Sequence, residues 1–398
     1  MTKDVKTFDK NSLNPTICCV VGTRPGIVMF APIIHELKKR NLDFFVIHTG
    51  QHYSPNMDSQ FFDDLKLPEV DYRIDGVPER KTHGGQTAAM LEGIEKILME
   101  RMPALVLVGG DANTNLAGAL AARKLNMMVG HVESGNRSYD WRMPEEHNRV
   151  IIDHVSDLLF ASDDLAMSVL EQETIHGVKI KTGNTIVDAS LQNLDIAMET
   201  SNALQTYGVS EGEYGIMTAH REENVDKKDV LQDLLTGVSK AGQALNTPIL
   251  FLAHPRTEKR LKEFGLTDWA NSLPNLRVLP PANYLDFIRL LSSAKILFTD
   301  SGGGQQEACI HHCPCVTTRN TSEWPDTITV GANRLAGHDP DLIVSQAKLA
   351  AASPKDWDIP FGDGTAAQKI IDACVEAIKN PPVIGVQPKD IQEYSAIN

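Results

Sequence analysis

The regular alternation of short apolar runs with longer amphipathic segments most restricts how this chain can fold. Residues 16–21, 104–108 and 127–132 form continuous apolar runs, and segments with helical spacing follow the first two at 27–40 and 113–125. Strands that are buried on both faces read as continuous apolar runs, and parallel neighbours must be joined by a crossover helix. The pattern therefore predicts an α/β fold with doubly wound parallel sheets.

The alternation occurs twice, which indicates two domains. The first series has expected strands at 16–21, 43–48, 104–108, 127–132, 157–161 and 178–182, and expected helices at 27–40, 83–100 and 113–125. The second series has expected strands at 214–218, 248–252, 277–279, 296–299 and 315–318, and expected helices at 227–244, 257–264 and 366–379. We expect two Rossmann-like domains, 1–190 and 205–375, that face a central cleft, with 376–398 packing back on the first. Ligands of such sheets bind beyond the carboxyl ends of the strands.

Composition argues against several classes of protein. The formal net charge of −14 makes nucleic acid an improbable partner. No apolar run approaches the length of a membrane span, and residues 1–15 lack the apolar core of a signal peptide, so we expect no membrane partner. Six cysteines in 398 residues are too few for a disulfide framework, so the expected location is a reducing cytoplasm.

One charged stretch, residues 131–149, follows the apolar run 127–132 and carries the densest set of functional side chains. Its acidic and basic residues are Glu133, Glu145, Glu146, Arg137, Arg142 and Arg149. Asp111 ends the neighbouring run in the same way. Carboxylates interleaved with arginines suit acid/base chemistry on an anionic substrate. The alternative interpretation is a solvated, charged loop.

The glycine-rich sequence Thr-Asp-Ser-Gly-Gly-Gly-Gln-Gln-Glu at 299–307 follows an apolar run and opens a helical segment. Backbone N–H groups of such a turn, together with the helix N-terminus, favour a phosphate. The lysine and the glycine spacing of the common nucleotide-binding loops are absent. Glu307 is placed to accept hydrogen bonds from a ribose. The alternative is a turn that only permits close packing.

Three further residues stand at expected strand ends: Arg24, His220 and His254. Arg24 lies in a turn stiffened by proline and glycine, where a guanidinium can clamp an anion, and the histidines are candidate acids. The alternatives are a surface arginine and structural histidines. The sequence Cys-Ile-His-His-Cys-Pro-Cys at 309–315 fits no zinc spacing, so no metal is expected.

Taken together, these sequences resemble the UDP-N-acetylglucosamine 2-epimerase family. The likeness rests on Gly-Thr-Arg-Pro (22–25), Thr-Gly-Gln-His (49–52), Gly-Asp (110–111), His-Val-Glu-Ser-Gly (131–135), Pro-Glu-Glu with Asn-Arg (144–149), Thr-Gly-Asn (182–184), Ala-His-Arg (219–221), Asp-Ser-Gly-Gly (300–303) and Thr-Ser-Glu-Trp-Pro (321–325). Each is short, but their common order over residues 20–337 makes the likeness specific.

The resemblance implies a two-domain fold of GT-B type, no cofactor, and interconversion of UDP-GlcNAc and UDP-ManNAc by anti elimination of UDP to a 2-acetamidoglucal, followed by readdition. It implies Asp111, Glu133, Glu145, His220 and Arg149 as catalytic residues. The substrate-binding set that we expect is Arg24, His52, Arg137, Arg142, His254, Ser301, Gly302, Gly303 and Glu307. The expected partners are a UDP-sugar substrate and, again by resemblance, a second copy in a homodimer.

Departures from the family pattern leave the sugar open. Met29 stands where the family usually has lysine, and the loop 136–142 looks like that of relatives acting on diacetamido-glucuronic nucleotides, in which Arg142 could meet a C6 carboxylate. The alternatives are therefore the same chemistry on UDP-2,3-diacetamido-glucuronic acid, or a hydrolysing enzyme that releases ManNAc. A glycosyltransferase on the same fold and a nucleotide-sugar sensor are more distant alternatives.

Overall fold

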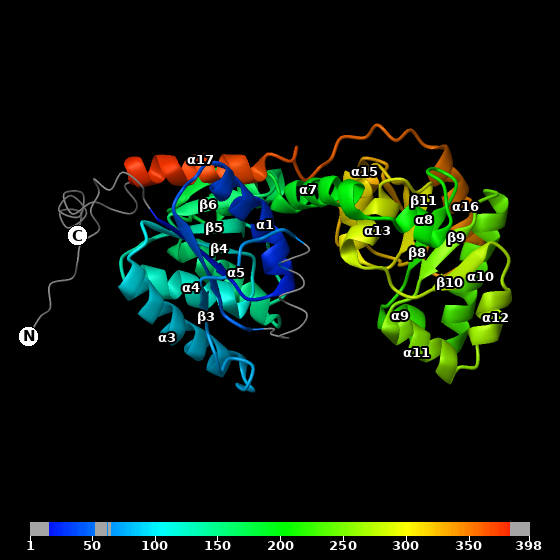
Figure 1. Ribbon diagram of the computed structural model, residues 1–398, viewed down its shortest axis with the longest axis horizontal. Coiled ribbons are helices and arrows are strands. Elements are labelled where there is room, and N and C mark those ends of the chain that lie inside the picture. Colours follow the sequence, from blue (N-terminus) through cyan, green and yellow to red (C-terminus); the bar gives the residue numbers. More distant parts are fainter. Residues whose placement is uncertain (1–15, 52–61, 63–64, 383–398) are drawn as a thin grey trace, which may run out of the picture. The chain divides into compact units, whose positions relative to one another are not determined.

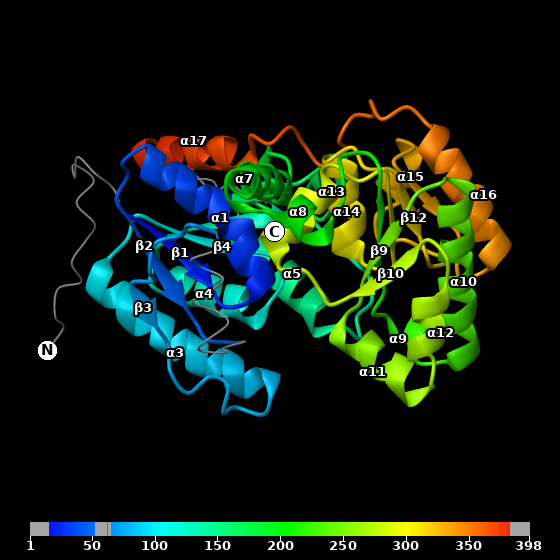
Figure 2. The same ribbon diagram turned by 45° about the vertical axis from the view of Figure 1, so that its right-hand side comes forward.

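The computed structural model describes residues 16–51, 62 and 65–382, and these form two compact units. Unit 1 takes its described residues from Met1–Ala189 and Phe361–Asn398, and unit 2 is Ser190–Pro360. No helix in the described part is long and apolar enough to cross a membrane. Each unit contains one sheet with helices packed on it (Figures 1 and 2).

Unit 1 is built on a sheet of seven strands in the order β3-β2-β1-β4-β5-β6-β7, and all the neighbouring strands run parallel. The strands are β1 Ile17–Val21, β2 Phe44–His48, β3 Tyr72–Arg73, β4 Leu105–Gly109, β5 Met128–Ser134, β6 Leu158–Ala161 and β7 Val178–Lys181. The helices are α1 Arg24–Lys39, α3 His83–Arg101, α4 Asn113–Lys124, α5 Pro144–Val155, α6 Asp164–Gln172 and α17 Ala366–Lys379, and α7 Thr185–Thr200 begins in this unit.

Alternate residues of β1 show how both faces of this sheet are covered. Ile17, Cys19 and Val21 belong to the core that contains α1 and α17. Cys18 and Val20 belong to the core that contains α3 and α4. Successive side chains of a strand point to opposite faces, so a continuous apolar run is what two helical layers require.

Unit 2 repeats the same topology with six parallel strands in the order β10-β9-β8-β11-β12-β13. Its strands are β8 Gly215–Thr218, β9 Ile249–Leu252, β10 Leu276–Leu279, β11 Ile296–Thr299, β12 Cys315–Thr317 and β13 Asn333–Leu335. Its helices are α8 Ala203–Tyr207, α9 Glu222–Val225, α10 Lys228–Ala244, α11 Pro255–Glu263, α12 Thr267–Ser272, α13 Tyr284–Leu291, α14 Gly302–Ile310, α15 Pro325–Thr329 and α16 Pro340–Ala352. Two doubly wound Rossmann-like sheets confirm the predicted fold class, while the cleft stays a prediction.

One helix was not predicted from the sequence, and another was placed in the wrong domain. Helix α5 spans Pro144–Val155, where no helix was predicted. The last helix, α17, was placed in the second domain as part of 205–375, yet it belongs to unit 1. Its apolar face, which includes Ile370, Ile371 and Cys374, completes the core beneath α1. Residues 383–398 lie outside the described residues.

Helix α17 lies along α1 (Figures 1 and 2), and specific polar contacts hold it there. Arg40, just after α1, forms an ion pair with Asp372 at 2.5 Å. Asp188 accepts hydrogen bonds from the N–H groups of Ala366 and Ala367, at 3.2 and 2.9 Å, and so caps the start of the helix. The end of the described chain therefore returns to the unit in which it began.

Ile371→Ala tests this assignment. Ile371 is fully buried, so its truncation should lower the free energy of unfolding by about 2–4 kcal/mol. Hydrogen exchange should increase in β1 of unit 1 and remain unchanged in β8 of unit 2. Leu349→Ala, at an exposed position of α16, is the matched control and should change stability by about 0.5 kcal/mol or less. Equal effects on β1 and β8 would contradict the assignment of α17 to unit 1.

Candidate active site

The acidic residues of unit 1 gather where β4 and β5 end side by side. Asp111 follows β4 after Gly110, whose φ of +79° favours glycine. Glu133 lies near the end of β5 at an irregularity of the ladder between Val132 and Ser134, with a φ of +63°. A Cβ added to Gly110 would lie 3.9 Å from Oε2 of Glu133. Bulges of this kind turn a side chain away from the regular alternation, and here the turned side chain is a carboxylate.

Helix α5 brings the other charged residues to the same place. Glu145 and Glu146 occupy its first turn, where the helix dipole favours acids. Arg149, one turn later, forms ion pairs with Asp111 and, at 2.9 Å, with Glu146. Asn148 donates a hydrogen bond to the backbone oxygen of Asp111 at 2.7 Å. The arginine and the amide thus fix the position of Asp111.

Glu146 has a different surrounding from Glu145. It is buried, and its carboxylate accepts hydrogen bonds from the N–H groups of Ser138 and Tyr139 at 2.8 and 3.0 Å. Burial opposes its ionisation, but these bonds and Arg149 lower the pKa of Glu146. Glu146 therefore holds the loop that precedes α5, whereas Glu145 is only partly buried.

The pKa of Glu133 is raised to about 7. Burial contributes most, and the negative charge of Asp111 adds to it, while a hydrogen bond from Asn184 and the charges of His131 and Arg149 act in the opposite direction. A carboxyl group that titrates near neutral pH can both take up and release a proton. Asn184 is a residue of this site that the predicted set lacked, although it ends the Thr-Gly-Asn sequence.

A cavity of about 430 Å³ opens beside these residues within unit 1. Asp111, Asn113, Glu145 and Asn148 contribute to one part of its lining. Residues from other elements complete it, namely Thr23, Pro25, Gln51, Lys81, Thr82, His83, Gln86 and Ala112. Two of the predicted catalytic carboxyl groups, those of Asp111 and Glu145, therefore line one cavity.

The predicted substrate-binding residues of unit 1 differ in their exposure and in the contacts that they make. Arg24 is exposed at the first residue of α1. The side chain of Arg142 is 90% exposed and pairs with Asp140 at 2.7 Å. His52 lies outside the described residues. For these three, substrate binding stays a prediction.

The prediction for Arg137 is contradicted by its surroundings. Its side chain is 1% exposed and forms ion pairs with Asp153 at 2.8 Å and Glu173 at 2.6 Å. A guanidinium that is enclosed and bonded to two carboxylates cannot also meet a ligand. Arg137 is therefore structural, because it ties the end of β5 to α5 and to the end of α6.

In unit 2 the glycine-rich sequence forms the start of α14. Ser301 is the N-cap, and its hydroxyl accepts a hydrogen bond from the N–H of Gly304 at 3.3 Å. Gly302 and Gly303 form the first turn, whose N–H groups have no acceptor within the helix. This arrangement suits an anion.

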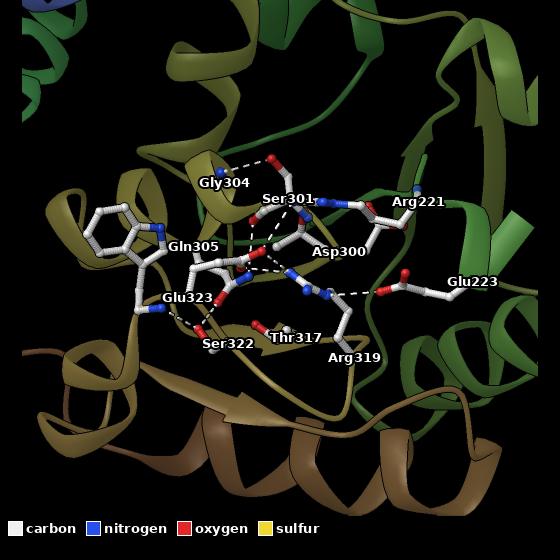
Figure 3. A network of polar contacts seen from close by, with 12 residues as sticks. Arg221, Glu223, Asp300, Ser301, Gly304, Gln305, Thr317, Arg319, Ser322 and Glu323 are labelled. Carbon is white, nitrogen blue, oxygen red and sulfur yellow. Dashed lines mark hydrogen bonds and ion pairs between the residues drawn. The ribbon is translucent and has the colours of Figure 1, made fainter. Parts of the chain in front are cut away.

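A network of charged residues surrounds this helix end (Figure 3). Arg319 contacts both oxygens of Glu323 at 2.7 Å and Glu223 at 3.2 Å. Arg221 reaches Glu323 at 3.3 Å. A Cβ added to Gly302 would lie 3.5 Å from Oε2 of Glu323. Two arginines therefore lie close to the helix N-terminus, and a carboxylate joins them.

His220 is held by a buried carboxylate. Asp300 is fully buried, accepts hydrogen bonds from the N–H groups of His220 and Arg221, and lies 3.0 Å from Nδ1 of His220. Burial opposes ionisation of Asp300, but these contacts lower its pKa. Because Asp300 accepts at Nδ1, the neutral ring of His220 has its acceptor on Nε2. Asp300 was quoted in the sequence pattern but not among the predicted site residues.

The other predicted residues of unit 2 lie near these elements. The ring of His254 is centred 5.5 Å from that of His220. Burial and the neighbouring His220 lower the pKa of His254. Glu307, in α14, has a pKa raised to about 7 by burial, which a hydrogen bond with Tyr284 partly offsets. His311 belongs to the cysteine- and histidine-containing segment 309–315. Its Nε2 lies 2.8 Å from the hydroxyl oxygen of Ser190, outside that segment.

Fold and site together define a class: an α/β protein with two Rossmann-like units, a carboxylate–arginine cluster in one, and in the other a helix N-terminus whose geometry suits an anion. The model of the family described as UDP-N-acetylglucosamine 2-epimerase matches residues 35–375. A UDP-N-acetylglucosamine 2-epimerase of Methanocaldococcus jannaschii is 44% identical over 355 residues, which cover 88% of this chain and 96% of the relative. The chain belongs to the UDP-N-acetylglucosamine 2-epimerase family, and its class of enzyme is isomerase.

Two further comparisons agree. A structure of Methanocaldococcus jannaschii UDP-GlcNAc 2-epimerase in complex with UDP-GlcNAc and UDP has a TM-score of 0.73 at 43% identity, with 91% of this chain and 99% of that chain covered. A UDP-2,3-diacetamido-2,3-dideoxy-D-glucuronate 2-epimerase of Pseudomonas aeruginosa is 34% identical over 359 residues, which cover 89% of this chain and 98% of the relative. The resemblance seen in the sequence is confirmed.

Glu133→Gln tests the environment of Glu133. A pKa raised from 4.5 to about 7 means that the folded protein binds this proton more tightly than the unfolded chain. The stabilisation is complete below pH 4.5 and is lost as the pH rises through about 7. The variant should therefore gain stability relative to the wild type between pH 5 and 8, by at most about 3 kcal/mol. Urea unfolding at several pH values measures the difference.

Glu307 has a similarly raised pKa. Its effect on stability is the same in the wild type and in Glu133→Gln, so it does not contribute to the difference between them. Glu100→Gln, at an exposed position of α3, is the control and should give a difference that is flat with pH. A flat difference for Glu133→Gln as well would show that Glu133 has an ordinary environment.

Proposed function

We propose that this protein interconverts UDP-GlcNAc and UDP-ManNAc without hydrolysis. The observation that carries the proposal is the grouping of Asp111 and Glu145 at one cavity, with Glu133 beside the Asp111 turn, in a chain 44% identical to a UDP-N-acetylglucosamine 2-epimerase. A sensor or a simple binding protein would need the anion site, but not two carboxyl groups at strand ends with a third at the start of α5.

The reaction needs acid/base groups on both faces of the sugar ring. A base removes the proton from C2 while the bond between C1 and the UDP oxygen breaks, which leaves a C1=C2 double bond and free UDP. Readdition of UDP at C1, with a proton delivered to the other face of C2, gives the epimer. The C2 proton is not adjacent to a carbonyl, so breaking of the C1–O bond leads and creates positive charge on the ring, which carboxylates stabilise.

Glu133 is suited to the proton transfers. With a pKa near 7, it is present in both protonation states at neutral pH, as reversible addition and removal of a proton require. Asp111 is held in place by its ion pair with Arg149, so it is suited to stabilising the positive ring. Glu145 is the third acid/base candidate.

The departing UDP requires positive charge. The free N–H groups at the start of α14, with the hydroxyl of Ser301, would bind the diphosphate, and Arg24 would add a cation. Glu307 would accept hydrogen bonds from the ribose. His220, oriented by Asp300, would present Nε2 as an acid/base group. These roles come from the family resemblance and agree with the local geometry of each residue.

A homodimer in the cytoplasm is part of the same proposal and rests on the resemblance and on the composition. Light scattering of the purified protein measures its mass. A mass of one chain at micromolar concentration would contradict the dimer.

Proton NMR of the purified protein with UDP-GlcNAc in deuterated water tests the proposal directly. We expect UDP-ManNAc to appear with deuterium at C2, because the proton removed there exchanges with solvent before its return. Free ManNAc and UDP would instead identify a hydrolysing enzyme. UDP-ManNAc without deuterium would contradict reversible deprotonation at C2.

A second candidate substrate is the UDP-2,3-diacetamido-glucuronic nucleotide. The relative with that activity covers 89% of this chain at 34% identity, and the exposed Arg142 could meet a C6 carboxylate. Arg137 is buried and already paired with two carboxylates, so it is not available to bind the C6 carboxylate. The same NMR assay with that nucleotide separates the two candidates by their rates.

Asp300→Asn tests the orientation of His220. An amide donates as well as accepts, so it favours the wrong tautomer of the ring, and kcat should fall on the order of 10²-fold. UDP binding, measured by calorimetry, should be retained. Asp226→Asn is the control, since Asp226 pairs with Arg256 and Arg260 in the same unit and should leave kcat unchanged. Equal rates for the two variants would contradict the role of Asp300.

A further inference from the structure

Helix α5 contacts three separate segments through one face. Glu146 holds the loop at Ser138 and Tyr139, and Arg149 holds Asp111. Asp153, one turn further on, is fully buried and takes no part in the chemistry proposed above. Residues 146, 149 and 153 are spaced by three and four, so they share one face of the helix.

The carboxylate of Asp153 binds both sides of the turn that follows β5. It accepts from the N–H of Gly135 at 3.1 Å, pairs with Arg137 at 2.8 Å, and lies 2.6 Å from Nδ1 of His131. Burial opposes the ionisation of Asp153, but His131 and Arg137 lower its pKa. The carboxylate is therefore charged and acts as an acceptor in all three contacts.

His131 carries the connection onward to β4. Its Nε2 lies 3.0 Å from the backbone oxygen of Gly110. A carbonyl oxygen only accepts, so the contact with Gly110 requires that Nε2 of His131 donates. Gly110 in turn donates its N–H to the oxygen of Val132 at 3.0 Å. The turn before Asp111 is thus bonded to β5 on two sides.

We propose that Asp153, through His131 and Gly135, is a positioning residue that sets the separation between the Asp111 turn and the Glu133 turn. The chain of contacts begins on α5 and passes through His131 to the residue that precedes Asp111. A second branch passes through Gly135 to the bulge that carries Glu133. This inference rests on the proposed function for its kinetic test.

The other end of β5 offers a matched control. Asp157 pairs with Arg123 at 2.7 Å and accepts a hydrogen bond from the N–H of Val129 at 2.8 Å. It therefore makes two of the same kinds of contact as Asp153, with an arginine and with a backbone N–H in or just after β5. Val129 lies near the beginning of that strand, away from the carboxyl end where Asp111 and Glu133 stand.

Asp153→Asn and Asp157→Asn should be compared in the epimerisation assay. Displacement of catalytic groups lowers the rate of the chemical step, so Asp153→Asn should lower kcat by about 10- to 100-fold with little change in KM. Asp157→Asn should lower the melting temperature by a similar amount but leave kcat within about twofold of the wild type. A purely structural role for Asp153 predicts equal kcat values for the two variants, and that result would overturn the proposal.

Hydrogen exchange keeps the test independent of the substrate. Asp153→Asn should accelerate exchange at Gly110 and Gly135, and Asp157→Asn should accelerate it at Val129. Unchanged exchange at Gly110 in Asp153→Asn would refute the positioning even if the protein acted on another nucleotide. A wild type that epimerises no UDP-sugar would refute the proposed function alone.

Two substitutions of His131 identify the contact that transmits the effect. A glutamine amide can occupy the place of Nε2 and donate to Gly110, whereas an asparagine amide reaches only the place of Nδ1. His131→Gln should therefore retain more kcat than His131→Asn. The reverse order would show that the bond to Gly110 does not matter.

Discussion

The ion pair between Arg149 and Asp111 is the interaction on which the organisation of unit 1 depends. Asp111 and Glu133 end neighbouring strands, and Glu146 lies close by, so three negative charges would repel one another at this edge. Arg149 pairs with two of them from a single position on α5. The third carboxyl group, that of Glu133, is enclosed, and burial together with the negative charge of Asp111 raises its pKa to about 7, although Arg149 acts in the opposite direction.

The two units solve the problem of an anionic substrate in different ways. Unit 1 uses side chains of opposite charge to hold carboxylates in place. The proposed anion site of unit 2 consists of backbone N–H groups at the start of α14, which have no partner in the helix. The buried acceptor Asp300 holds the neighbouring His220 and Arg221 by their backbone N–H groups. A backbone site binds phosphate without titrating, whereas proton transfer requires groups that titrate. This division supports the proposal that unit 2 binds the nucleotide and unit 1 supplies the acid/base groups.

Much of the fold could be predicted because continuous apolar runs specify strands buried on both faces. The α5 segment was missed because its first two turns are mostly polar, which hides the helical pattern. Two of the charged residues in those turns, Glu146 and Arg149, are among those that hold the site together. Arg137 was misassigned for a related reason: sequence shows where a charge lies along the chain, but not which carboxylates enclose it. The place of α17 could not be predicted, since its apolar face fits either sheet and only contacts such as Arg40 with Asp372 decide.

The left-handed backbone at Glu133 connects these observations. A residue with a side chain at a φ of +63° costs about 1–2 kcal/mol relative to ordinary strand geometry. That cost is borne at the one position of β5 where a carboxylate must leave the regular alternation. The next two turns of chain are fixed by bonds to buried charges, Gly135 to Asp153 and Ser138 to Glu146. The strained conformation therefore persists because α5 fixes the chain just beyond it. The same helix carries one catalytic candidate, Glu145, in its first turn and supports a second, Glu133, through Asp153.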